Sequence, residues 1–259
     1  MARVAFLCTN SQHCPKGHGP FLLEYSLHDG SQRRKAGYNA MGLIAIGDIH
    51  GCAKSFDALL DEIDPSSDDH LLFVGDYIDR GPDSKGVIDR LLELRDEVEC
   101  TFLRGNHESL MLGYLDDGAF NLWRVNGGVS TLQSYLGSGE SDIEIPDTHA
   151  EFVRETKLYH ETDDYFFVHA GLKPHLTIEE NLEQNDEKVF MWEREHLGSD
   201  EFAWEKTVVC GHTPRPEPIN REKLILIDTG CVYHMQPGMG KLTAVRLPER
   251  EFIDVEYMD

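Results

Sequence analysis

The chain has 259 residues, 40% of which are hydrophobic, and its formal net charge at pH 7 is −23. A chain of this length buries roughly 75% of its unfolded surface, so it folds without a disulfide or a structural metal. Its apolar runs fall short of the ~18 residues that span a bilayer. Its acidic surface repels the phosphates of nucleic acids, so we expect neither a membrane nor a nucleic-acid partner.

Six cysteines are spread along the chain without a C-x-x-C pair. This usage is typical of free thiols in a reducing compartment and not of a disulfide framework. We therefore expect a cytoplasmic protein. We also expect it to work as a monomer.

Residues 1–42 differ from the rest of the chain. They hold five lysines and arginines against two acidic residues, so this segment carries +3 and the remaining residues carry −26. Their apolar residues follow no sustained period, and Gly, Ser, Asn and His are frequent. We expect an N-terminal appendage without a fold of its own, as in a leader or a flexible tail, before a folded domain over residues 43–259.

Three apolar runs then end, one after another, in polar turns. The turns are residues 47–51 (GDIHG), 75–81 (GDYIDRG) and 105–108 (GNHE). They are about thirty residues apart, the length of a strand plus a crossover helix. Apolar residues at helical spacing fill residues 53–63 and 82–94 between them. The pattern predicts a β-α-β-α-β unit with parallel strands and right-handed crossovers.

The second half continues with helices and then strands. Residues 118–160 are predicted to be mainly helical, apart from a loop over 137–146. Strands are expected over residues 165–168, 206–210 and 224–227, with two antiparallel closing strands over 242–247 and 252–257.

Five of these strands end in Asp, His or Asn beside a glycine, which lets the backbone turn sharply. Ligands of open α/β sheets bind at the carboxyl ends of the strands, so we expect these side chains to meet at one end of a sheet. Their oxygen and nitrogen donors suit Mn, Fe or Zn. Six ligands suit two ions roughly 4 Å apart that share a carboxylate. The set is Asp48, His50, Asp76, Asn106, His169 and His212.

The three opening turns resemble the signature motifs of the phosphoprotein phosphatase group of calcineurin-like metallophosphoesterases. Residues 169–171 (HAG), 211–214 (GHTP) and 192–194 (WER) are similar to its later motifs. The resemblance covers about residues 43–247 and is strongest to bacterial and bacteriophage lambda-type serine/threonine protein phosphatases. It implies an α/β fold with a central β-sandwich of two mixed sheets flanked by helices, and makes residues 43–259 a catalytic domain.

The resemblance also implies the metal ligands. Asp48 and His50 would hold the first ion, and Asp76 would bridge both ions. The second ion would be held by Asn106, His169 and His212. The implied cofactors are two divalent ions, Mn first, with Fe or Zn as alternatives. A hydroxide between the ions would be the nucleophile.

The remaining roles follow from the same resemblance. Arg80 and Arg194 would clamp the phosphoryl oxygens, with Asn106 as a further phosphate contact. His107 would protonate the leaving group, and Asp79 would fix its tautomer. Arg104 and Glu108 are interpreted as structural.

The motifs leave more than one substrate open. The first hypothesis is a phosphomonoesterase for phosphoserine and phosphothreonine, extending to phosphotyrosine, in a phosphoprotein or a small phosphoester. The alternative is a symmetrical bis(5'-nucleosyl)-tetraphosphatase, which the resemblance extends to through residues 228–231 (DTGC). Asp79 favours the phosphomonoesterase, because a poor alkoxide leaving group needs the acid pair more. An inactive binding module is disfavoured by the intact ligand set, and a nuclease by the acidic surface.

Overall fold

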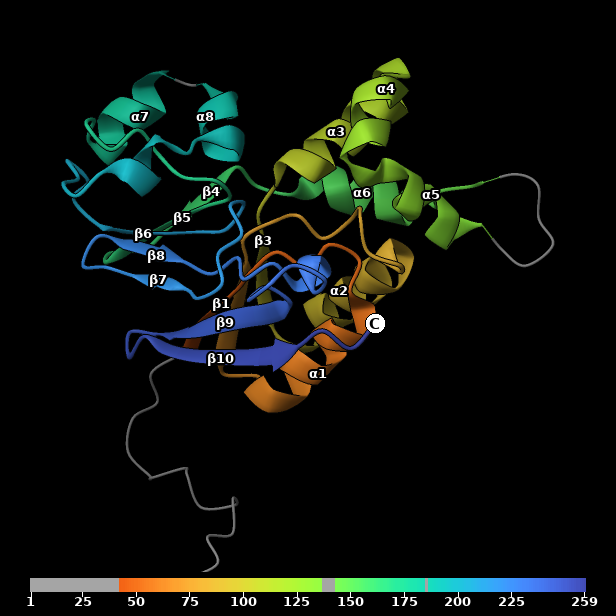
Figure 1. Ribbon diagram of the computed structural model, residues 1–259, viewed down its shortest axis with the longest axis horizontal. Helices are drawn as coiled ribbons and strands as arrows, with labels where there is room; N and C mark the ends of the chain where they lie inside the picture. The colour runs from red at the N-terminus through yellow and green to blue at the C-terminus, as the bar shows by residue number, and fades with distance from the viewer. Residues whose placement is uncertain (1–41, 137–142, 185) are drawn as a thin grey trace, which may run out of the picture. The chain divides into compact units, whose positions relative to one another are not determined.

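The computed structural model describes residues 42–136, 143–184 and 186–259 (Figure 1). The appendage predicted for residues 1–42 falls, except for Gly42, outside the described residues, as does most of the predicted loop over 137–146. In the part of the chain that is described, no helix is long and apolar enough to cross a membrane.

Two five-stranded sheets form the centre of the domain. The first has the order β10-β9-β1-β2-β3, and its parallel core of β1, β2 and β3 confirms the predicted β-α-β-α-β unit. Antiparallel β9 and β10 close its edge as predicted. The second has the order β4-β5-β6-β8-β7. The strands are β1 (Gly42–Ile46), β2 (Asp69–Phe73), β3 (Glu99–Phe102), β4 (Tyr159–Glu161), β5 (Tyr165–Val168), β6 (Thr207–Cys210), β7 (Ile219–Asn220), β8 (Leu224–Leu226), β9 (Lys241–Leu247) and β10 (Glu251–Glu256).

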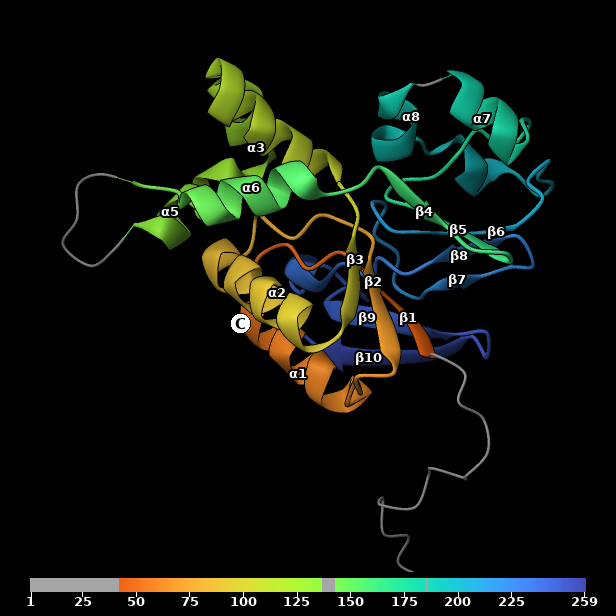
Figure 2. The same ribbon diagram turned by 180° about the vertical axis from the view of Figure 1, so that it is seen from behind.

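Helices cover the outer face of each sheet, which gives the predicted α/β/β/α layering. Figures 1 and 2 show α1 and α2 against the first sheet and α7 and α8 beside the second. The helices are α1 (Ala53–Ile63), α2 (Ser84–Glu97), α3 (Asn106–Asp117), α4 (Phe120–Trp123), α5 (Val129–Tyr135), α6 (Asp147–Glu155), α7 (Ile178–Gln184) and α8 (Glu187–Trp192). A π-helical turn, η1 (Arg124–Gly128), joins α4 to α5, and 3-10 turns η2 (Glu195–Gly198) and η3 (Cys231–Tyr233) lie in the second half.

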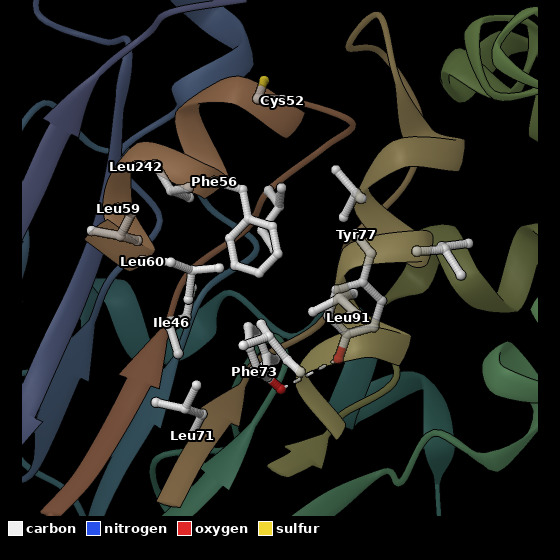
Figure 3. Packing of buried hydrophobic residues seen from close by; sticks show 14 of the residues in the cluster. Ile46, Cys52, Phe56, Leu59, Leu60, Leu71, Phe73, Tyr77, Leu91 and Leu242 are labelled. Carbon is white, nitrogen blue, oxygen red and sulfur yellow. Dashed lines mark hydrogen bonds between the residues drawn. The ribbon is translucent and has the colours of Figure 1, made fainter. Parts of the chain in front are cut away.

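The central strands are apolar throughout because both of their faces are buried. On β1, Ile44 and Ile46 pack towards the helices, whereas Ala45 packs between the sheets. On β5, Phe166 and Val168 pack towards α7 and α8. Figure 3 shows the layer under α1 and α2, where Phe56, Leu59 and Leu60 of α1 meet Ile46 and Phe73 of the first sheet.

One expectation about the strands was wrong. The five strands that end in polar turns do not share one sheet: β1, β2 and β3 belong to the first, and β5 and β6 to the second. A strand buried on both faces carries no period that tells which sheet it joins, so the sequence could not assign it. The strand ends nevertheless come together, because the two sheets pack face to face through a shared core of residues such as Leu72, Phe167 and Val209.

Candidate metal centre

The turns that carry the site have unusual backbone geometry. Among the described residues, seven non-glycine residues have a positive φ, and five of them lie in these turns. They are His50 (49°), Asp76 (54°), Asp79 (74°), Arg80 (70°) and His212 (67°). Such conformations cost about 1–3 kcal/mol each and persist only where the surroundings enforce them. Their gathering at one place marks a functional site.

Backbone hydrogen bonds hold the first two turns together. His50 N–H donates to the Asp76 carbonyl at 2.8 Å, and Gly51 N–H donates to the Tyr77 carbonyl at 2.8 Å. Gly81 passes so close that a Cβ there would lie 2.0 Å from the His50 carbonyl oxygen, which only glycine avoids. The side chains of the two turns are thereby brought to one point.

Glu108 joins the second and third turns. Its buried carboxylate accepts the backbone N–H groups of Asp76 at 2.8 Å, Tyr77 at 2.9 Å and Gly105 at 2.9 Å. Burial and the nearby Asp76 carboxylate raise the pKa of Glu108 to about 7. These contacts agree with the structural role expected for this residue.

Asp76 lies at the centre of the cluster. The atoms that His50, Asp76 and His107 offer to a metal lie within 4.8 Å of one another, and so do those of Asp76, His169 and His212. Two groups that share one buried carboxylate match a pair of ions bridged by that carboxylate. The Asp76 Oδ2 atom is 3.6 Å from His50 Nε2 and 3.4 Å from His169 Nε2.

Hydrogen bonds prepare two of the imidazoles as ligands. The Nδ1 atoms of His50 and His169 lie 2.9 Å from the carbonyl oxygens of Ile78 and Val74. A carbonyl can only accept, so each Nδ1 carries a proton and each Nε2 is the nitrogen left for a metal. This is the usual support of a metal-ligating histidine. The Nε2 atom of His50 contacts the Arg80 guanidinium in this structure. The buried His212 Nε2 has no hydrogen-bond partner among the described residues.

Buried charges also fit a cation here. Burial raises the pKa of Asp48 well above its usual range, and the Asp228 and Asp76 carboxylates add to it. Burial raises the pKa of Asp228 to about 6. Burial also acts to raise the pKa of Asp76, but the neighbouring imidazoles of His169, His107 and His50 bring it well below its usual range. Burial, and to a smaller extent the nearby His169 imidazole, lowers the pKa of His212 to about 2. The His212 side chain therefore stays neutral and able to bind a metal.

Two predicted ligands take different positions from the rest. Asp48 accepts the His212 backbone N–H at 3.0 Å and lies outside both three-residue groups. In the first group, His107 lies beside His50 in the place expected for Asp48. Asn106 Oδ1 lies 3.1 Å from His169 Nε2, at the edge of the second group. All six predicted ligands are nevertheless buried and meet around Asp76.

The two predicted arginines lie beside different histidines of the cluster. The partly buried Arg80 guanidinium contacts His50 Nε2 and lies 5.5 Å from the ring centroid of Tyr233. Arg194 Nε donates to Thr213 Oγ1 at 3.2 Å, next to His212. A guanidinium group next to these ligand groups is able to bind phosphoryl oxygens.

The predicted acid pair is in contact. His107 Nδ1 lies 2.6 Å from Asp79 Oδ2, both side chains are fully buried, and His107 Nε2 lies 3.9 Å from Asp76 Oδ2. Trp192 and Tyr233, which the sequence did not single out as site residues, lie at the rim. Trp192 is 38% exposed and its ring meets His212 edge-on at 5.7 Å. Only the fold shows that these aromatic residues border the metal groups.

Comparison with known proteins agrees with this geometry. The model of the calcineurin-like phosphoesterase family matches residues 41–242. The chain belongs to the calcineurin-like phosphoesterase family. It is therefore a metallophosphoesterase, a hydrolase of a family that uses two divalent ions, and the resemblance to the phosphoprotein phosphatase group is confirmed.

Relatives within the family carry two kinds of name. The chain is 29% identical to bis(5'-nucleosyl)-tetraphosphatase PrpE [asymmetrical] of Oceanobacillus iheyensis, over 83% of this chain and 92% of the relative. It is 32% identical to serine/threonine-protein phosphatase 1 of Salmonella typhimurium, over 78% of this chain and 90% of the relative. A crystal structure of a candidate diadenosine tetraphosphatase superposes with a TM-score of 0.63 at 23% identity, over 85% of this chain and 95% of that one, and shows the shared fold.

Proposed function

We propose that this metallophosphoesterase cleaves dinucleoside tetraphosphates. The sequence motifs alone placed phosphoserine and phosphothreonine first and the symmetrical cleavage of dinucleoside tetraphosphates second. The relatives reverse the order, because the tetraphosphatase PrpE of Oceanobacillus iheyensis matches 83% of the chain. The observation that carries the proposal is an arginine and an aromatic ring beside each of the two ligand groups that share Asp76.

The rim suits a substrate with charge in the middle and a base at each end. Arg80 and Tyr233 lie on the His50 side, and Arg194 and Trp192 on the His212 side. Stacking of a base on an aromatic ring contributes about 1–3 kcal/mol and tolerates any base. A polyphosphate chain held by the arginines would place its two nucleosides towards these rings.

The residues around Asp76 supply the metal chemistry. We propose Asp48 and His50 for one ion, Asp76 for both, and Asn106, His169 and His212 for the other. Their oxygen and nitrogen donors suit Mn, with Fe or Zn as the other candidates. Two such ions would lower the pKa of water to around 7 and neutralise phosphoryl charge. Arg80 and Arg194 orient the phosphoryl group, and His107 donates a proton to the leaving oxygen.

A second candidate function rests on the Asp79–His107 pair. The 2.6 Å contact provides a general acid for an alkoxide, which leaves poorly without a proton. A nucleotide leaving group needs this help less. Dephosphorylation of phosphoserine or phosphothreonine is therefore the competing proposal, and the Salmonella typhimurium phosphatase of the same family supports it.

The free thiols support the cytoplasmic location that the cysteine pattern predicts. Among the described residues, Cys52, Cys100, Cys210 and Cys231 are unbridged. We propose that the protein works there on a soluble phosphate compound.

Diadenosine tetraphosphate with added Mn tests the main proposal. Chromatography of the products is expected to show ADP alone for a symmetrical cut, or ATP and AMP for an asymmetrical one. Chelation and Asp76→Asn should each abolish the reaction. An intact nucleotide, in a sample that hydrolyses a phosphothreonine peptide, would overturn the tetraphosphatase in favour of the second candidate.

A further inference from the structure

The Asp79 side chain is enclosed by donors from another part of the chain. Trp123 Nε1 lies 3.0 Å from Asp79 Oδ1 and 2.9 Å from Oδ2. Thr131 Oγ1 donates to Oδ1 at 2.6 Å, and His107 Nδ1 lies 2.6 Å from Oδ2. All four side chains are 0% exposed. The carboxylate therefore meets three side-chain donors and is shielded from bulk solvent.

Counting protons fixes the direction of this network. The Thr131 hydroxyl has one proton, and the Asp79 carboxylate receives it. Ser84 Oγ, 2.9 Å away, must then donate to Thr131 Oγ1. The Asp79 backbone N–H donates to both hydroxyl oxygens, at 3.0 Å to Ser84 and 2.9 Å to Thr131. An acceptor-only carboxylate at this place holds a proton on His107 Nδ1, so Nε2 faces the metal cluster. In the imidazolium form, paired with Asp79, Nε2 carries the second proton, and this is the proton that would pass to the leaving oxygen.

The two outer donors come from a segment that also touches Arg80. Trp123 ends α4 and Thr131 lies on α5, and the π-helical turn between them includes Gly127 with a φ of 111°. The Gly127 carbonyl accepts the Arg80 backbone N–H at 3.4 Å. Gly128 lies against the Trp123 ring, where a Cβ would stand 2.5 Å from Cδ2.

These contacts do more than fill the core. An indole bonded to both oxygens of a carboxylate sets its plane, and Thr131 sets its rotation. Without them, Asp79 could still neutralise an imidazolium but would not hold one ring orientation. The conformation of Asp79 itself, with a φ of 74°, also needs outside support.

We propose that Trp123 and Thr131 are positioning residues, which lock the Asp79 carboxylate and through it hold His107 in the orientation that delivers a proton to the leaving oxygen. The inference rests on the proposed phosphoester chemistry but not on which substrate is natural. Its signature is a loss that grows as the leaving group becomes poorer, because only a poor leaving group needs the proton.

The test compares Trp123→Phe and Thr131→Val with wild type on 4-nitrophenyl phosphate and phenyl phosphate with Mn. General acids contribute 10²–10⁴-fold, so kcat on phenyl phosphate should fall by about tenfold to 100-fold in each variant. On 4-nitrophenyl phosphate it should fall by less than about threefold, with KM unchanged on both. Thr131→Ser keeps the hydroxyl and should restore the wild-type ratio of the two rates.

Trp204→Phe is the matched control. Trp204 is 2% exposed and its indole donates to the Lys173 carbonyl at 3.1 Å, so its loss also removes a buried hydrogen bond. It should leave the ratio of the two rates unchanged. Equal losses on both phosphates in Trp123→Phe and Thr131→Val would show mere damage to the site and overturn the inference, as would no loss at all.

A measurement without turnover separates this inference from the proposed function. The chain has three tryptophans, so three indole N–H signals are expected by NMR. The signal lost in Trp123→Phe should exchange slowly with water and should shift in Asp79→Asn, whereas that of Trp204 stays in place. If the Trp123 signal does not respond to Asp79→Asn, the positioning role is wrong even in an active enzyme. If the signal responds but no phosphoester is cleaved, the proposed function fails. The catalytic role of Trp123 and Thr131 then fails with it.

Discussion

Divalent ions are expected to stabilise the folded protein. The dependence of the stability on ion concentration should reveal how many ions bind. The buried Asp48, Asp76 and Asp228 side chains concentrate negative charge where two ligand groups share Asp76. An ion that binds only the folded state adds about 1.4 kcal/mol of stability for each tenfold rise in its free concentration above the dissociation constant. Two ions add about 2.7 kcal/mol.

The melting temperature converts this into an observable. In a domain of this size 1 kcal/mol corresponds to roughly 2–4 °C. The Tm should therefore rise by about 5 to 11 °C for each tenfold increase of free Mn, and by half of that if one ion binds. Chelator-treated protein provides the baseline, and the slope is read from thermal denaturation in a buffered Mn series.

Asp76→Asn is the informative variant, because both ligand groups use this carboxylate. Its slope should fall to that of one ion or less. Asp254→Asn is the matched control, since the Asp254 carboxylate of β10 pairs with Lys241 of β9 at 3.1 Å and is 41% exposed. It should keep the wild-type slope. A wild-type slope of one ion, or no dependence on Mn, would refute the shared two-ion centre.

Three further predictions concern single side chains. In steady-state kinetics, Trp192→Ala should raise KM for diadenosine tetraphosphate by about tenfold and leave KM for 4-nitrophenyl phosphate unchanged. Trp192→Phe should keep most of the binding of the dinucleotide. Equal effects of Trp192→Ala on both substrates would contradict a base-stacking role. Arg194→Ala should lower kcat/KM by about tenfold to 100-fold on both substrates, because it removes charged hydrogen bonds to phosphate. Its Tm should hardly change, since the exposed guanidinium bonds only Thr213 among the described residues; a large Tm loss would assign Arg194 a structural role. Burial lowers the pKa of His196 to about 4. As the pH falls, the unfolded state therefore binds a proton on His196 at a higher pH than the folded state does. The stability that is present above pH 6.5 is lost as the pH falls towards 4. Between pH 7.5 and 5, urea unfolding should show wild type losing about 2 kcal/mol more than His196→Gln; equal losses would rule this out.

The opening half of the domain was readable from its sequence for physical reasons. Buried parallel strands are apolar throughout, and their turns need glycine and polar ligands, so the runs before residues 47–51 and 75–81 stood out. The long amphipathic helix α1 was equally plain, with Phe56, Leu59 and Ile63 on one face.

The parts that were missed lack such signals. Helix α7 is a short segment with Glu179 and Glu180 in its first turn and only Ile178 and Asn181 buried, and β7 has two residues. The pairing of strands into two sheets depends on contacts between distant segments. The same holds for Asp79, because its partners Trp123 and Thr131 lie 44 and 52 residues further along the chain. No local pattern announces a hydrogen bond of that kind.

The substrate claim is tested most directly by competition. Diadenosine tetraphosphate and a phosphothreonine peptide, mixed at equal concentration with Mn and one sample of the protein, report the ratio of their kcat/KM values regardless of how much of the sample is active. The aromatic rings and arginines beside the His50 and His212 groups predict that the dinucleotide is consumed at least tenfold faster. Faster release of phosphate from the peptide would contradict the proposed function and establish the Asp79–His107 pair as the feature that decides the substrate.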